Sequence, residues 1–134
     1  MRTTRLIGVM AVVTALSGLP AAAQTPLKDV AHVRDGIIHV GMAYELSEKC
    51  GRISARIFRG LGFLRSLENH ARDLGYSEAE IDAYINNDDE RDRLEGIARA
   101  ALADLGVVEG DEASYCTVGR AQIAANTRIG WLLR

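Results

Sequence analysis

The sequence has few aromatic residues and few cysteines, and each shortage argues against a class of site. Aromatic residues make up 5% of the 134 residues, too few to predict the stacking platforms that bind single-stranded nucleic acid. The chain has only two cysteines, whereas a zinc site takes three or four ligands. The sequence therefore gives no support for nucleic-acid binding or for a zinc site built on cysteine.

Catalytic and cofactor-binding motifs are also missing. The chain has no G-x-S-x-G, no H-E-x-x-H, no glycine-rich phosphate loop and no C-x-x-C-H haem-attachment motif. None of its three histidines has a plausible nucleophile beside it in the sequence. The acidic run at residues 88–92 lacks the alternating ligands and central glycine of a calcium loop, and indicates the charged start of a helix instead. The sequence thus predicts no enzymatic activity, no cofactor and no metal.

The first 23 residues predict an address outside the cytoplasm. Arg2 and Arg5 precede a short apolar run, and the segment ends in the small-x-small pattern of Ala21 and Ala23. This is the layout of a secretory signal peptide, and the run is too short and too interrupted for a transmembrane helix. We expect cleavage after Ala23, no membrane span in the mature protein, and a single domain over residues 24–134.

The charge balance of the mature chain is moderately acidic. Removal of the leader takes away two of the 16 basic residues and none of the 18 acidic ones, so the net charge becomes −4, that is 14 minus 18. Nucleic-acid binding requires a dense basic surface, which this balance argues against. The same balance gives no reason to expect binding to anionic lipid.

Cys50 and Cys116 are predicted to form one structural disulfide. They are 66 positions apart, and an isolated pair in a small secreted domain usually forms a bridge. The alternatives are a redox couple or half of a metal site. Catalytic redox pairs are usually close in sequence, as in C-x-x-C, so the structural reading is favoured.

Hydrophobic periodicity predicts an all-α fold, a compact irregular bundle of about five helices stapled by the disulfide, with no credible strand. A capping box at Ser77 and Glu80 marks the start of the third helix, and Gly75 and Gly106 mark the ends of the second and fourth helices. Gly119 and Gly130 are expected to interrupt the last helix and to allow close approach. The expected helices span about residues 28–49, 52–74, 77–85, 88–105 and 111–133.

The order of several motifs resembles one known family. The residues that carry the likeness are Asp29-Val30-Ala31, Asp35-Gly36, Cys50, Ile53-Ser54-Ala55-Arg56, Leu74-Gly75-Tyr76-Ser77, Glu80-Ile81, Ala83-Tyr84, Tyr115-Cys116, Gly119 and Ile129-Gly130-Trp131-Leu132-Leu133-Arg134. Together they resemble domain of unknown function 5333, a family of small secreted alphaproteobacterial proteins. The resemblance covers essentially the whole mature chain and implies a periplasmic location. It carries over no catalytic residue.

Two surfaces are candidates for binding a partner. Arg52, Arg56 and Arg59 would be stacked at helical spacing on the second helix, where they could bind an anionic ligand or an acidic surface, or pair with acids of this chain. Trp131 is the only tryptophan and lies in an apolar ending. It either docks on the core, the reading that the sequence favours, or serves as an anchor for a partner.

His32, Asp35 and His39 share one side of the first helix and could hold a metal or a small ligand. A helical wheel places them opposite Val33 and Tyr44, however, which favours a solvated face. We therefore expect a non-enzymatic periplasmic protein that binds another protein, either as an acid-stress chaperone or as an inhibitor or immunity protein. The alternative is a small-ligand or metal carrier that uses this face.

Overall fold

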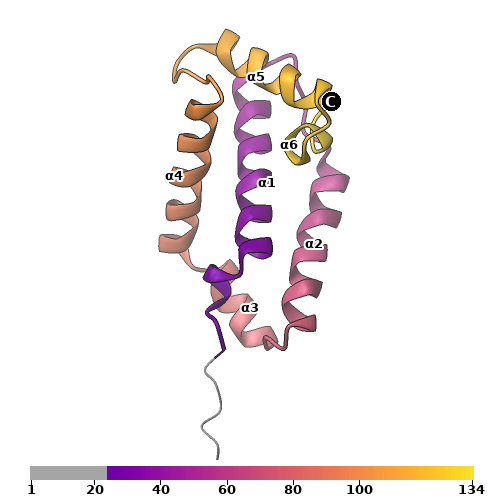
Figure 1. The fold of residues 1–134 in the computed structure, drawn as a ribbon, viewed down its shortest axis with the longest axis vertical. Helices are drawn as coiled ribbons and strands as arrows, with labels where there is room; N and C mark the ends of the chain where they lie inside the picture. Colours follow the sequence, from indigo (N-terminus) through magenta and orange to yellow (C-terminus); the bar gives the residue numbers. More distant parts are fainter. Residues whose placement is uncertain (1–23) are drawn as a thin grey trace, which may run out of the picture.

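The computed structural model describes residues 24–134, and the predicted leader at residues 1–23 lies outside that part. The described chain is all-α, as predicted, with six α-helices after one short 3-10 helix (Figure 1). It contains no strand, only an isolated antiparallel bridge between Ala55 and Leu133. The elements are η1 (Leu27–Asp29), α1 (Ala31–Lys49), α2 (Ile57–Asp73), α3 (Glu78–Ile85), α4 (Asp88–Asp104), α5 (Glu112–Ala124) and α6 (Arg128–Trp131).

α1 is the central helix of the bundle. α2 and α4 flank it, α5 lies across one of its ends, and α3 lies near the other (Figure 1). Two glycines of α1 let its neighbours approach closely. A Cβ atom at Gly36 would lie 2.7 Å from a methyl carbon of Leu67 on α2, and one at Gly41 would lie 3.6 Å from the Cβ of Ala98 on α4. Small residues thus set the spacing of the three long helices.

The hydrophobic core consists of two clusters. The larger gathers buried residues of α1, α4, α5 and α6 around Leu46, Leu102 and Leu133. Cys50 and Cys116 lie in this cluster, with a sulfur–sulfur distance of 2.02 Å, so the predicted disulfide is confirmed. The smaller cluster joins η1, α1, α2 and α3 and includes Val33 and Tyr76. The disulfide therefore ties the end of α1 to α5 inside the larger cluster.

Several predicted helix ends are confirmed. Ser77 accepts a hydrogen bond from the backbone N–H of Glu80, whose carboxylate accepts one from the N–H of Ser77, which completes the capping box. Gly75 and Gly106 follow α2 and α4 with φ angles of 93° and 110°, a conformation that favours glycine. α4 is capped by Asn87, whose side chain accepts from the N–H of Glu90. The cap therefore lies one residue before the acidic run that was expected to start this helix.

The second helix starts five residues later than predicted, at Ile57 rather than Arg52. The preceding segment is extended and pairs with the last residues of the sequence. Ser54 and Arg134 exchange two backbone hydrogen bonds, and the N–H of Arg56 donates to the carbonyl of Leu132. These backbone groups thus find their partners far along the chain, which periodicity within one segment does not reveal.

The predicted last helix is two helices, so the described residues form six α-helices rather than about five. α5 continues through Gly119 without interruption, and the break falls at Asn126, which has a φ angle of 48°. Thr127 then caps α6 by accepting a hydrogen bond from the N–H of Gly130. Gly130 packs against the end of α5 so closely that a Cβ atom there would lie 1.9 Å from the carbonyl oxygen of Gln122. The expected close approach therefore occurs at this glycine.

Candidate functional site

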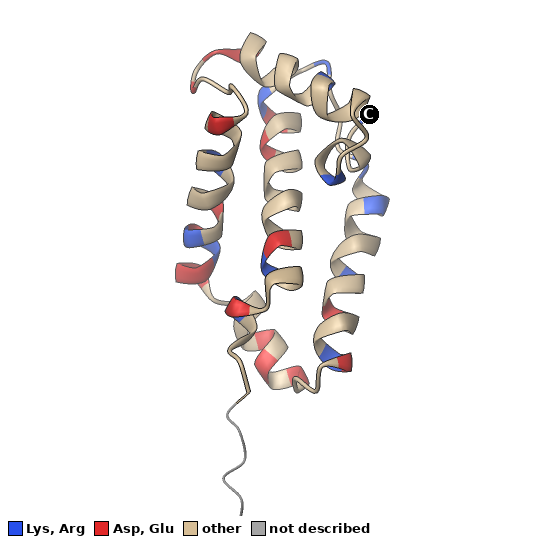
Figure 2. Cartoon of the chain, in the orientation of Figure 1, with Lys and Arg blue, Asp and Glu red and all other residues tan. Residues whose placement is uncertain are grey.

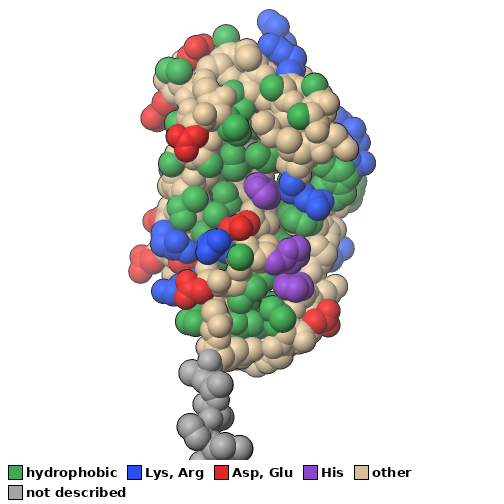
Figure 3. All heavy atoms as spheres, viewed as in Figure 1, with side chains coloured by type: hydrophobic (Ala, Val, Ile, Leu, Met, Phe, Trp, Pro, Cys, Tyr) green, Lys and Arg blue, Asp and Glu red, His purple; other side chains and the backbone are tan. Residues whose placement is uncertain are grey.

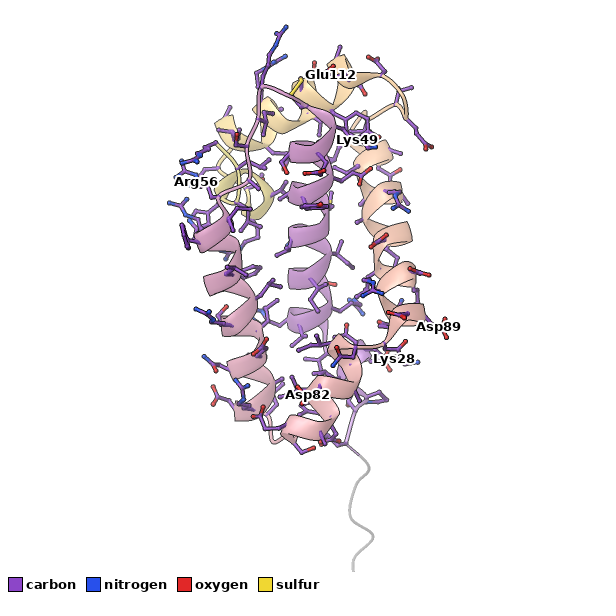
Figure 4. The ribbon with its side chains drawn as sticks, turned by 180° about the vertical axis from the view of Figure 1, so that it is seen from behind. Lys28, Lys49, Arg56, Asp82, Asp89 and Glu112 are labelled. Atoms are coloured by element: carbon purple, nitrogen blue, oxygen red, sulfur yellow. A yellow bond between two sulfur atoms is a disulfide. The ribbon has the colours of Figure 1, made fainter. Side chains whose placement is uncertain are left out.

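A groove runs along α1 between α2 and α4. Figure 4 shows this arrangement from behind, with α3 across the lower end. The groove contains a cavity of about 390 Å³ that is open to the surface, within the size range of binding sites for small molecules. Its apolar lining comes from five elements: Leu27 of η1; Val33, Ile37, Ile38, Val40 and Tyr44 of α1; Leu64, Leu67 and Ala71 of α2; Ile81, Tyr84 and Ile85 of α3; and Leu94 of α4.

The groove exists because α1 is apolar on more than one side. Met42, Leu46 and Cys50 belong to the larger core cluster with residues of α5 and α6. Val33 and Tyr44 lie on another side of the helix and line the groove instead. η1 and α3 cover this second apolar stripe at Val33, in the smaller core cluster, whereas its part from Ile37 to Tyr44 faces the open groove.

The walls of the groove expose large apolar side chains. Tyr44 of α1 is 58% exposed and Ile85 of α3 is 49% exposed, although both line the cavity. On α2 the stripe of Leu64 continues at helical spacing to Leu61 and Ile57, which are 46% and 61% exposed. The expectation that Tyr44 belongs to a buried face is therefore wrong. Contiguous exposed apolar surface of this kind marks interaction sites.

The charges around the groove are paired within the chain. Glu68 lies 3.6 Å from Arg72, and Glu95 lies 3.1 Å from Arg99. Arg91, at the same rim, pairs with Asp88. Each of these partners lies one helical turn away on the same helix, so the rim presents little net charge to an occupant.

Two polar groups lie at the closed end of the cavity. The hydroxyl of Tyr84 is buried and has no hydrogen-bond partner within the described chain, and burial raises its pKa. The carboxylate of Glu90, a residue only 9% exposed, accepts hydrogen bonds of 2.6 and 2.9 Å from Arg93. These bonds lower the pKa of Glu90. Because protein atoms cover this hydroxyl, an occupant could bond to it only after neighbouring side chains moved.

The ion pair of Glu90 predicts a pH-dependent stability. Because its pKa is lower in the folded than in the unfolded protein, the pair stabilises the fold above the unfolded-state pKa of about 4.3. This contribution is lost as the pH falls through the lowered value. Glu90→Gln should therefore reduce the free energy of unfolding at neutral pH but not near pH 2, as measured by urea titration. Glu95→Gln, at an exposed pair, is the control and should change little at either pH; an equal loss for Glu90→Gln at both pH values would contradict the assignment.

The structure brings Arg59 and Trp131 together. The guanidinium of Arg59 lies 4.7 Å from the centre of the Trp131 ring and donates a 2.9 Å hydrogen bond to the Trp131 carbonyl. Arg128 lies over the same ring, at 5.1 Å. Trp131 itself is partly buried against the larger core cluster. Arg59 and Trp131, which come from the two candidate surfaces, thus lie together, and the indole is largely engaged within the chain.

The predicted helical row of three arginines is wrong. Arg52 and Arg56 precede α2, because residue 52 lies in a turn and residues 54–56 are paired with the last residues of the sequence. The side chain of Arg56 donates to the carbonyl of Leu133 at 2.8 Å, and Figure 4 shows it at the N-terminal end of α2. Arg52 is exposed. A role for these residues in binding remains a prediction.

The three histidines gather on the face opposite the groove (Figure 3). The ring of His32 lies 4.5 Å from that of His70 on α2, and Asp35 pairs with Arg34. His32 is exposed, whereas Asp35 and His39 are half-buried. Within residues 24–134 no group of three or more histidine, cysteine or acidic side chains is placed to hold a metal ion.

Sequence reasoning missed the groove and the exposed end of α2. Phe58 is 91% exposed and lies outside the apolar stripe of this helix, whereas Ile57 and Leu61 belong to that stripe and are nevertheless exposed. One signal was available in α1, where apolar residues occupy more of the helix than one neighbouring helix can cover. That excess indicates several contacts but does not show which of them remains open.

Comparison with known proteins identifies the family of the chain but does not identify a function. Residues 25–134 match the family described as "Family of unknown function (DUF5333)". No curated protein and no solved structure matches the chain. Among the described residues, no helix is both long enough and apolar enough to cross a membrane. Since the match covers nearly all of the described chain, the protein belongs to the DUF5333 family.

Proposed function

We propose that the protein is a non-enzymatic, periplasmic binding module whose groove holds an amphipathic helix of a partner protein. The observation that carries the proposal is the apolar groove along α1, with exposed apolar walls and a charge-paired rim. Supporting the location are the predicted leader and the disulfide between Cys50 and Cys116, since disulfides persist in oxidising compartments.

The groove has the length of a short helix. Its open stripe on α1 runs from Ile37 to Tyr44, which at a rise of 1.5 Å per residue is about 10 Å, or two turns. A helix in such a groove binds through apolar residues at positions i, i+3 or i+4, and i+7. The partner's helix would occupy the open side of α1, where a four-helix bundle would have its fourth member.

The exposed apolar residues favour binding at neutral pH. An acid-stress chaperone would expose apolar faces such as Ile57, Leu61 and Leu64 as its carboxylates are protonated. Ile57 and Leu61 are already exposed in the native fold, and Leu64 lines the open cavity. The helices therefore do not need to loosen at acid pH for this apolar surface to be exposed. Of the two protein-binding roles, the inhibitor or immunity type fits this geometry better.

A small apolar ligand is the second candidate occupant. The observation in its favour is the buried Tyr84 hydroxyl, which has no partner among the described residues. A ligand with one hydrogen-bonding group at its end would satisfy that hydroxyl while its apolar part fills the cavity. The Tyr84→Phe variant separates the two candidates. It should still bind a partner helix, but it should lose affinity for such a ligand, which needs the hydroxyl.

The test of the proposal compares two equally exposed positions. Tyr44→Glu places a charge in the groove, and Val108→Glu places one on a side chain that is 59% exposed and outside the cavity lining. Both variants should fold, since neither residue is buried. We expect Tyr44→Glu to weaken capture of the periplasmic partner at least about tenfold and Val108→Glu to leave it unchanged. Because the rim charges are paired, salt should have little effect; equal binding by both variants would refute the groove as the site.

A further inference from the structure

The charges of the fold are segregated. Residues 52–67 and 113–134 contain seven arginines and no aspartate or glutamate. The rest of the described chain holds seven basic and all 18 acidic residues, a net charge of −11. The two arginine-bearing segments pack together through the pairing of Ser54 with Arg134 and the contact of Phe63 with Trp131. Figure 2 accordingly shows red on α1, α3, α4 and the lower part of α2, but none around α6 and the upper part of α2. We call this surface the arginine end.

The arginines of this end are not neutralised by the chain. All the ion pairs found among residues 24–134 involve other arginines, so none of the seven has an acidic partner there. Arg59 and Arg128 lie against the ring of Trp131, which holds their charges in place. Arg52 and Arg65 are exposed. The end is thus a fixed positive surface on an acidic protein.

The most exposed apolar side chain of the described residues lies on the same surface. Phe58 is 91% exposed, and its neighbours Ile57 and Leu61 are 61% and 46% exposed. Phe58, Leu61 and Arg65 follow one another at spacings of three and four residues, so they share one face of α2. The cavity in the groove is not lined by Ile57, Phe58 or Leu61. These side chains therefore form a projecting apolar tip beside unpaired arginines.

We propose that the arginine end docks on an anionic membrane surface, with Phe58 and Ile57 inserted among the lipid headgroups and arginines such as Arg52 and Arg65 facing the phosphates. Membrane-surface binding combines buried apolar area with attraction to anionic lipid. A projecting tip suits a fluid bilayer, whereas a protein partner requires a matching hollow. The net charge of −4 did not predict this positive surface, because it is the sum over two parts of the chain that carry opposite charge. The site adjoins the groove along α2 but lies outside its cavity lining, and the inference goes beyond the proposed function.

The test measures co-sedimentation of the purified protein with vesicles. Vesicles of phosphatidylcholine with about one-third phosphatidylglycerol should bind the protein at low salt, and vesicles of phosphatidylcholine alone should bind it far more weakly. Raising the salt from about 0.05 M to about 0.5 M should release it. Phe58→Ala should weaken binding at least about tenfold, and each of Arg52→Gln and Arg65→Gln about fivefold. All three side chains are exposed, so the variants should fold.

The controls come from the acidic part of the chain. Val108→Ala and Arg99→Gln alter exposed residues outside the arginine end and should leave vesicle binding unchanged, as should the groove variant Tyr44→Glu. Binding that ignores phosphatidylglycerol content, or that survives both Phe58→Ala and Arg65→Gln, would overturn the proposal. Capture by polyglutamate at low salt with no binding to either vesicle would also overturn it, and would assign the surface to an acidic polypeptide instead.

Discussion

Gly130→Ala is expected to lower the free energy of unfolding by about 3 kcal/mol or more. The added Cβ would lie 1.9 Å from the carbonyl oxygen of Gln122 and 2.6 Å from the backbone nitrogen of Ile123. Both are backbone atoms at the end of α5, so no side-chain rotation relieves the clash. Either α6 moves away from α5 or the last turn of α5 distorts. Urea unfolding followed by circular dichroism measures the loss.

The matched control is a glycine with open space around it. Gly62 lies within α2, and a Cβ atom there meets nothing within 4 Å. Gly62→Ala should therefore stabilise the protein by about 0.5–1 kcal/mol, because alanine is the better helix former. If Gly130→Ala were as stable as the parent protein, the close packing of α6 on α5 would be incorrect.

Replacing Cys50 and Cys116 together by alanine is expected to cost about 2–5 kcal/mol of stability. The disulfide closes a loop of 66 positions, so its removal gives much conformational freedom to the unfolded chain. Both cysteines are also buried in the larger core cluster, at 0% and 5% exposed. The helical circular dichroism spectrum should change little below the unfolding transition.

Thiol labelling separates the loss of the bridge from the loss of packing. In the parent protein purified without reductant, neither Cys50 nor Cys116 should react with a thiol reagent, even in denaturant. Reduction of the parent should then reproduce most of the stability loss of the double alanine variant. Two reactive thiols in the unreduced protein would contradict the disulfide and revive a redox or metal role.

Local patterns predicted the parts of the fold that depend on local interactions. The capping box at Ser77 and Glu80 and the glycine stops at Gly75 and Gly106 act within one helical turn, and the structure confirms them. The disulfide was also predictable, because the chain has only two cysteines. The family was identified from the order of motifs such as Tyr115-Cys116, and the match over residues 25–134 agrees.

Contacts between distant segments account for what was not predicted. Residues 52–56 look helical by their spacing, but their backbone pairs with residues 132–134. The break at Asn126 turns α6 back against α5, and only the tertiary fit of Gly130 explains it. The start of α2 and the number of helices both depend on these long-range contacts.

The same difference between local and long-range interactions explains which parts of the candidate sites were predicted. The candidate arginines and the tryptophan were chosen by residue type. In the structure Arg59 contacts Trp131, but the three arginines do not form a row on one helix. The groove was missed because it depends on which side of α1 the later helices leave open. The arginine end was missed because the two segments that form it are some 60 residues apart in a sequence whose net charge is negative.

Site-specific photo-cross-linking tests the central claim, that a partner helix occupies the groove, most directly. A photoreactive phenylalanine analogue would replace Tyr44 in one variant and Val108 in another, and each would be irradiated in cells of the native host. We predict that the analogue at position 44 links to one apolar stripe of a helix in one partner protein, as mapped by mass spectrometry, and that the analogue at position 108 does not. No adduct at position 44, or the same adducts at both positions, would contradict the account.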